Sequence, residues 1–164
     1  MATRWLSTEE QRTWRAFLTA TQGLFKELDR ELQRDAGMPH TYYEILVQLS
    51  EAPGRSMRMS DLADSSLSSR SRLSHAIARL EEAGWVRREE CPSDGRGSYA
   101  VLTQEGFAVL ERAAQGHVEA VRTNLFERLS SEQVGQLRAI SESLAGPSGC
   151  RPAVAPCAET SFRD

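Results

Sequence analysis

The chain has 164 residues, which suits one domain, or one domain with an appended dimerisation region, and 40% of them are hydrophobic. No apolar run approaches the roughly 18 residues that a membrane helix needs, and the charged N-terminus lacks the apolar segment of a signal peptide, so we expect a cytoplasmic protein. The net charge of −3 argues mildly against a nucleic-acid partner. Residues 68–80, however, carry three arginines and no acid, and contacts to phosphate depend on local charge.

The first predicted element is a long amphipathic helix over residues 7–36. Ser7 and Glu10 form a capping box, in which the hydroxyl caps the helix and the carboxylate reaches back. Apolar residues then recur at spacings of three and four for about five turns. Gly37 and Pro39 end the pattern, as glycine and proline commonly do after a helix.

Three short elements are predicted next. A second capping box, from Thr41 to Glu44, predicts a helix that the Pro-Gly pair at 53–54 closes. Residues 55–59 alternate in the manner of a very short strand. Ser60 then caps a brief helix, which a turn at 65–68 follows.

A further helix is predicted from about Ser69 to Ala83, with Gly84 as its left-handed cap. Leu73, Ala76, Ile77 and Leu80 form its buried stripe. Ser71, Ser74, His75 and Ala78 then point outward, with Arg70, Arg72 and Arg79 near the edges. Small hydroxyls allow close approach to base edges, and arginines reach phosphate or guanine. The alternative interpretation is a solvated helix face.

A β-hairpin is predicted directly afterwards, with strands at 85–91 and 97–103 and a turn-rich loop between them. Arg96 stands in that loop between two glycines. An exposed arginine there would gain from the negative potential of a narrow minor groove, and Asp94 could brace it through paired hydrogen bonds. A surface loop without this role is the alternative.

Two long helices complete the predicted order. Thr103 opens the first, and the capping box at Ser130 to Gln133 opens the second, which runs to about 145. Residues 146–164 include three prolines and little apolar periodicity, which predicts a disordered tail. The long helices at both chain ends cannot bury their apolar stripes on a middle region of about 60 residues, so we expect them to pack against a second copy of the chain.

Residues 60–106 resemble the DNA-reading region of the multiple antibiotic resistance regulator (MarR) family of winged helix-turn-helix transcriptional regulators. That family shows a Leu-Ala helix, a Ser-rich helix ending in Arg-Leu-Glu-x-x-Gly, a wing with Asp-x-Arg and a closing Leu-Thr-x-x-Gly. This chain has Leu62-Ala63, Arg79-Leu80-Glu81 with Gly84, Asp94-Gly95-Arg96, and Leu102-Thr103 with Gly106. With the flanking helices, the resemblance covers about residues 7–145.

The resemblance implies a mainly α fold, a winged helix-turn-helix head with a small β-hairpin wing, flanked by long N- and C-terminal dimerisation helices. Residues 1–145 would form one MarR-like domain, with 7–36 and 104–145 as dimerisation helices and 41–103 as the winged helix-turn-helix, which we call the reading head. A homodimer would bind a pseudo-palindromic operator. The DNA-binding residues predicted from the pattern and the resemblance together are Ser69, Arg70, Ser71, Arg72, Ser74, His75, Arg79, Asp94 and Arg96.

Two positions depart from the family. Gly97 stands where members often have a second arginine or a polar residue, which makes the wing less basic. His75 stands where arginine is common, which would weaken attraction to phosphate and make binding sensitive to pH.

The family also implies a small aromatic or phenolic effector between the dimerisation helices and the reading head. The candidate lining is Trp14, Arg15, His40, Tyr42 and Tyr43. The alternative is that these side chains are interhelical core. Such a ligand would release the regulator, which we expect to be a repressor, from its operator.

Other classes find little support in the residues. The chain has no Gly-x-Ser-x-Gly elbow, phosphate-binding loop or Cys/His group with metal-ligand spacing, so we expect no enzyme activity, no cofactor and no metal. Cys91, Cys150 and Cys157 do not suggest a disulfide framework. A winged-helix module for protein contact remains the alternative function, and it would require an apolar face on the helix at 69–83.

Overall fold

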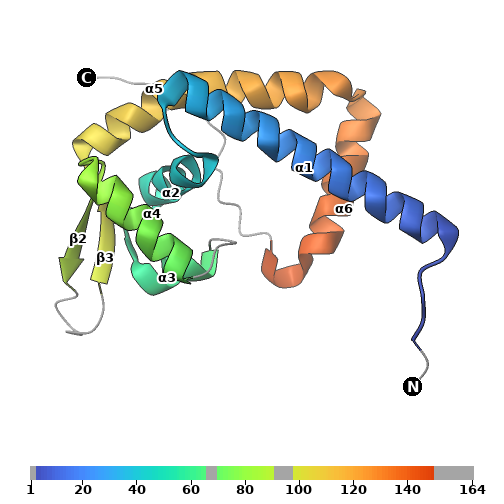
Figure 1. The fold of residues 1–164 in the computed structure, drawn as a ribbon, viewed down its shortest axis with the longest axis horizontal. Coiled ribbons are helices and arrows are strands. Elements are labelled where there is room, and N and C mark those ends of the chain that lie inside the picture. Colours follow the sequence, from blue (N-terminus) through green and yellow to red (C-terminus); the bar gives the residue numbers. More distant parts are fainter. Residues whose placement is uncertain (1–2, 66–69, 91–97, 150–164) are drawn as a thin grey trace.

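The computed structural model describes residues 3–65, 70–90 and 98–149, and these form a mainly helical fold with one small sheet (Figure 1). The long helices α1 and α5 lie side by side along one edge, and in this view α6 overlaps the N-terminal half of α1. The shorter elements cluster beneath the other half. The elements in chain order are α1 (Thr8–Ala36), α2 (His40–Glu51), η1 (Pro53–Arg55), β1 (Ser56–Arg58), α3 (Met59–Ser65), α4 (Arg70–Glu82), β2 (Val86–Glu90), β3 (Ser98–Leu102), α5 (Gln104–Asn124), η2 (Phe126–Arg128) and α6 (Ser131–Gly149).

The capping boxes predicted for α1 and α6 are both present. The Glu10 N–H donates to Ser7 Oγ at 3.2 Å, and the Ser7 N–H donates to Glu10 Oε2 at 2.7 Å. The Ser130 N–H donates to Gln133 Oε1 at 2.9 Å, with the reciprocal bond at 3.3 Å. Each pair satisfies two backbone donors that the helix itself leaves open.

The predicted starts of α2 and α3 are wrong. Helix α2 begins at His40 rather than after Thr41, and its first N–H donates to Asp29 Oδ1 of α1 at 2.8 Å. A carboxylate from another helix therefore replaces the local hydroxyl. Helix α3 begins at Met59, so Ser60 lies inside it, and its hydroxyl donates to Asp61 Oδ1 at 3.1 Å.

The core of the reading head lies between α2, α3, α4 and the sheet. The stripe predicted for α4 is confirmed, since Leu73, Ala76, Ile77 and Leu80 are all buried. The same core cluster contains Ile45, Leu46, Leu49, Leu62, Val86, Ala100 and Leu102. Burial of these side chains fixes the rotation of α4 about its own axis.

The predicted hairpin is confirmed, and the short strand predicted at 55–59 joins it. Strands β2 and β3 are antiparallel, with Val86 opposite Leu102 and Glu90 opposite Ser98. Strand β1 pairs with the other side of β3, which gives the order β1-β3-β2. Of the residues 92–96 expected at the hairpin tip, none lies within the described residues.

A tight junction joins the base of the hairpin to α5. The Thr103 hydroxyl accepts from the Gly106 N–H at 3.0 Å and donates to the Gly84 carbonyl at 2.7 Å. A β-carbon added at Gly106 would collide with the carbonyl of Trp85. The spacing Leu-Thr-x-x-Gly thus has a physical cause: threonine caps α5, and only glycine lets its first turn approach the hairpin.

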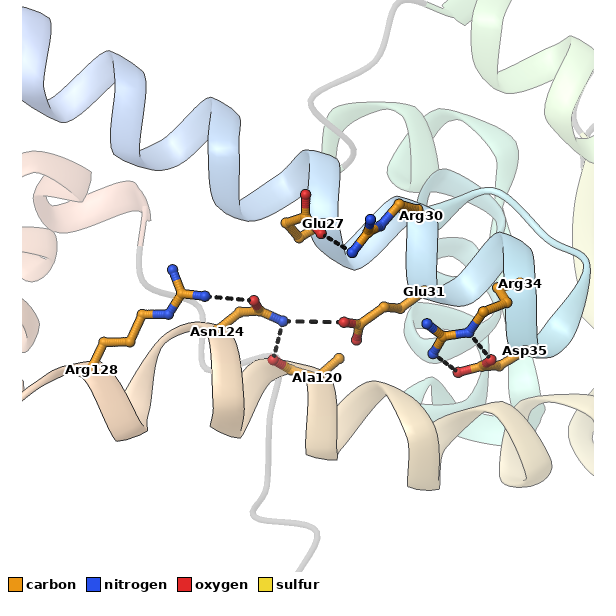
Figure 2. Close-up of polar contacts among 8 residues, drawn as sticks. All are labelled: Glu27, Arg30, Glu31, Arg34, Asp35, Ala120, Asn124 and Arg128. Carbon is orange, nitrogen blue, oxygen red and sulfur yellow. Dashed lines mark hydrogen bonds and ion pairs between the residues drawn. The ribbon is translucent and has the colours of Figure 1, made fainter.

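A hydrogen bond between Asn124 and Glu31 joins α5 to α1 (Figure 2). Asn124 Nδ2 lies 3.4 Å from Glu31 Oε1 of α1 and 3.0 Å from the carbonyl of Ala120, while Arg128 donates to Asn124 Oδ1 at 3.1 Å. On α1, Arg34 and Asp35 form a two-bond pair. Of these contacts, the one between Asn124 and Glu31 runs between the two long helices, whereas the Arg34–Asp35 pair lies within α1.

Helix α6 is assigned to Gly149 but breaks at Gly146, which has φ 65° and ψ −177°. We expected residues 146–149 to belong to the tail. In the structure they continue the range of α6, but only after the break at Gly146. Residues 150–164 of the predicted tail lie outside the described residues.

Candidate nucleic-acid interface

The outer face of α4 is the candidate interface. Because Leu73, Ile77 and Leu80 point into the core, the opposite side of the helix faces solvent. Ser71, Arg72, Ser74, His75 and Arg79 are exposed there, while Ala78 is only half exposed. Five of the predicted DNA-binding residues are thus brought together on one face.

The other four predicted DNA-binding residues lie at the start of α4 or outside the described residues. Arg70 is the first residue of α4. Ser69, Asp94 and Arg96 lie outside the described residues, as do Cys91, Cys150 and Cys157. The wing-arginine role of Arg96 therefore stays a prediction.

The two acids at the end of α4 are each paired with an arginine. Arg79 lies 2.7 Å from Glu82 across one turn, and this hydrogen bond and charge raise the pKa of the Arg79 guanidinium. Glu81 lies 3.1 Å from Arg88 of β2. Sequence reasoning missed both pairs. The i,i+3 spacing of Arg79 and Glu82 is a local signal that could have found the first, whereas Arg88 reaches Glu81 only through the position of β2.

A groove of about 570 Å³ lies between α4 and the start of α2. It brings Tyr42, a predicted effector residue, together with Arg72, His75 and Arg79 of the predicted DNA-binding set. The other lining residues are Pro39, Thr41, Ala76, Ala78 and Glu82. The groove therefore offers cationic groups and one phenol ring on the same surface.

The other predicted effector residues separate into two places. His40 and Tyr43 pack around His117 of α5, with ring centroids 5.5 and 4.4 Å from it. Trp14 and Arg15 are exposed near the other end of α1. Trp14 precedes Phe25, which contacts His40, by about 16 Å of helix axis.

His117 was missed by the sequence reasoning, since only the packing of α5 on α2 brings it to His40. Burial, with a smaller contribution from His40, lowers the pKa of His117 to about 4. Its Nδ1 is buried without a hydrogen-bond partner. Among residues 3–65, 70–90 and 98–149, no group of three or more His, Cys, Asp and Glu is arranged to hold a metal ion.

The terminal helices leave apolar side chains in solvent. Trp14, Phe17 and Phe25 of α1 are about half exposed, and Ile140 and Leu144 of α6 are 57% and 70% exposed. Further exposed apolar residues are Trp5, Leu6, Val118, Phe126 and Leu137. A single copy of the chain thus leaves these side chains uncovered.

A three-helix head with an exposed polar face on its last helix, followed by an antiparallel hairpin, defines a winged helix-turn-helix protein. The MarR family model matches residues 36–97. Over 86% of this chain, the structure is similar to Sco3205, a MarR family transcriptional regulator from Streptomyces coelicolor in complex with DNA, with 56% identity, 92% of that chain covered and a TM-score of 0.82. The chain belongs to the MarR family of transcriptional regulators.

Two other relatives are also named as transcriptional regulators. AbsC, a MarR family transcriptional regulator from Streptomyces coelicolor, is 44% identical over 87% of this chain and 96% of its own, with a TM-score of 0.80. PecS, an HTH-type transcriptional regulator from Dickeya dadantii, is 36% identical over 81 residues, which are 49% of this chain. The matched segment spans only about half of PecS, 48% of its length. These relatives are named as regulators, not enzymes. In the part of the chain that is described, no helix combines the length and apolarity needed to cross a bilayer.

Proposed function

We propose that this protein is a homodimeric transcriptional regulator that binds a pseudo-palindromic operator in double-stranded DNA. The observation that carries the proposal is the outer face of α4, where hydroxyls, an imidazole and arginines stand exposed on a helix held rigid by its buried stripe. Such groups suit base edges and phosphates. The relative with 56% identity is described as bound to DNA, which supports the same role here.

The protein-contact alternative has less support. A helix that docks on another protein would present an apolar surface, whereas Ser71, Ser74 and His75 stand at the centre of the exposed face of α4. Arg72 and Arg79 flank them. The face therefore fits a polar, negatively charged partner better than an apolar one.

The uncovered apolar residues of α1 and α6 support the homodimer. Trp14, Phe17, Ile140 and Leu144 would be covered if the terminal helices of two copies packed together. Two recognition helices in a symmetric dimer reach successive major grooves about 34–36 Å apart. A two-fold operator follows from that symmetry.

We extend the proposal to repression relieved by a small aromatic ligand in a cytoplasmic protein. The groove beside Tyr42 and the ring cluster of His40 and Tyr43 lie between α2 and its neighbours. Because α2 also packs on α1 and α5, a ligand that shifts α2 would move each reading head relative to those long helices and so change the spacing of the two α4 helices. Transcription from the gene's own promoter should fall on adding the protein and recover with the ligand.

Selection from a randomised DNA library tests the central claim. We expect enrichment of a two-fold sequence whose log affinity falls steeply with log salt. Arg72→Gln should weaken binding to the selected duplex, whereas Arg112→Gln, which removes the same charge from exposed α5 surface, should have little effect. Failure to enrich any sequence at low salt would contradict the proposal.

A further inference from the structure

Arg88 of β2 spans two turns of α4. Its Nε lies 3.1 Å from Glu81 Oε2, and its backbone N–H donates to Glu81 Oε1 at 3.1 Å. Its terminal nitrogen also donates to the carbonyl oxygen of Ser74 at 3.3 Å. Ser74 and Glu81 are separated by about 10 Å of helix axis. One residue of the hairpin therefore contacts both the middle and the last turn of α4.

These contacts affect orientation more than the free energy of unfolding. The side chains of Arg88 and Glu81 are 38% and 31% exposed, and ion pairs in such positions contribute little to stability. The planar fork of arginine nevertheless fixes direction, because its donors point along set lines. The backbone N–H of Arg88 adds a second connection to the same carboxylate.

The pair also removes an unfavourable charge. Glu81 is an acid on the helix that carries the candidate interface, where it would repel phosphate. Arg88 neutralises it from the neighbouring strand, as Arg79 neutralises Glu82 on the helix itself. Loss of Arg88 would both free the hairpin from α4 and leave the Glu81 carboxylate without this partner.

We propose that Arg88 is a positioning residue for sequence-specific DNA recognition, which sets the angle between α4 and the β2–β3 hairpin by holding Glu81 and the Ser74 carbonyl. The inference rests on the proposed function and deepens it. A recognition helix and a wing must enter adjacent grooves together. A wrong angle between them would therefore disrupt contacts to specific bases before it weakens the general attraction to phosphate. Affinity for DNA of any sequence depends mainly on total charge and changes less.

The test compares Arg88→Gln with Arg87→Gln. Arg87 is the neighbouring residue on β2, and its Nε donates to Glu89 of the same strand at 2.9 Å. Both variants lose one positive charge from the same strand, so their general electrostatic effect is matched. The probes are the tightest duplex selected from a randomised library and a random-sequence duplex of equal length. The measured quantity is the ratio of the two dissociation constants.

We expect Arg87→Gln to weaken both complexes by similar factors and leave the ratio unchanged. Arg88→Gln should reduce the preference for the selected duplex by about tenfold, a change equivalent to about 1.4 kcal/mol. Thermal melts of the two variants should agree within a few degrees, because neither side chain is buried. An equal ratio in the two variants would overturn the inference.

Rescue separates positioning from a merely structural effect. The double variant Glu81→Arg with Arg88→Glu restores only the ion pair, with opposite polarity, because a carboxylate cannot donate to the Ser74 carbonyl, so we expect it to recover only part of the preference. Arg88→Lys, which keeps the charge without the fork, should fall between wild type and Arg88→Gln. A double variant that recovers none of the preference would count against a positioning role for the Arg88–Glu81 pair. If the unmodified chain itself shows no preference, the proposed function fails and takes the inference with it. If the preference survives Arg88→Gln, only the inference fails.

Discussion

The ring of Tyr43 lies 4.4 Å from the ring of His117, which joins α2, the first helix of the reading head, to the long helix α5. His40 approaches the same imidazole at 5.5 Å, and Phe25 of α1 packs on His40 at 5.6 Å. Four rings from three helices thus meet at the boundary between the reading head and the long helices. A charge placed on His117 would enter this cluster.

The first prediction concerns pH. Burial lowers the pKa of His117 to about 4 from an ordinary 6.5, so the unfolded chain binds the proton more readily than the folded one. The corresponding stability is complete above about pH 6.5 and is lost as the pH falls toward 4. We expect His117→Phe to lose less thermal stability than wild type between pH 7.5 and pH 5. His75→Gln removes an exposed histidine and should follow wild type. Identical pH profiles for all three proteins would contradict this account.

The second prediction concerns Gly106. A methyl group there would collide with the Trp85 carbonyl, so Gly106→Ala should lower the free energy of unfolding by about 1–3 kcal/mol. Gly116→Ala is the matched control on the same helix, since its added carbon would meet only Asp35 Oδ2 at 3.7 Å. Helix propensity then favours alanine by up to about 1 kcal/mol. Urea denaturation measures both, and a Gly106→Ala protein as stable as wild type would show that the junction tolerates movement.

The third prediction concerns the exposed apolar face of α6. Ile140→Glu places a charge where we propose that a second copy packs, so the protein should sediment as a monomer and lose affinity for the selected duplex. Ile140 is 57% exposed in a single chain, so the substitution leaves the fold of one copy intact. Ala139→Glu adds the same charge to exposed surface on the side of α6 away from Leu137 and Leu144, and it should stay dimeric. A dimer that survives Ile140→Glu would place the interface elsewhere.

The fourth prediction concerns Arg96, which the sequence places between two glycines at the hairpin tip. Arg96→Ala should weaken binding to the selected duplex without changing the melting temperature. Arg12→Ala removes the same charge from exposed surface near the start of α1 and should bind as wild type does. Fluorescence anisotropy with labelled DNA measures both. An unchanged dissociation constant for Arg96→Ala would remove the proposed wing contact.

Local sequence signals predicted most of the fold. Ser7 with Glu10, Ser130 with Gln133, and Thr103 cap helices through residues three positions away, so short-range spacing is enough to find them. The buried stripe of α4 is also confirmed, because helical periodicity is visible within a short stretch of sequence. The start of α2 was misplaced because its cap is Asp29, a residue of another helix.

The candidate site was predicted less completely. The exposed face of α4 follows from one helical period, which is visible in the sequence. The pairing of Arg88 with Glu81 and the meeting of His40 with His117 depend on how separate elements pack, which no local pattern records. Trp14 and Arg15 were grouped with His40 through the resemblance, yet α1 carries them away from it.

The Thr103 side chain, which donates to the Gly84 carbonyl while it caps α5, has a mechanical consequence. Its backbone N–H also donates to the Trp85 carbonyl at 3.0 Å, so the root of β2 and the first turn of α5 are fastened at one residue. A tilt of α5 would therefore move the base of the hairpin with it, because Thr103 is bonded to both. Packing of a second subunit against the far end of α5 would then change the orientation of the wing.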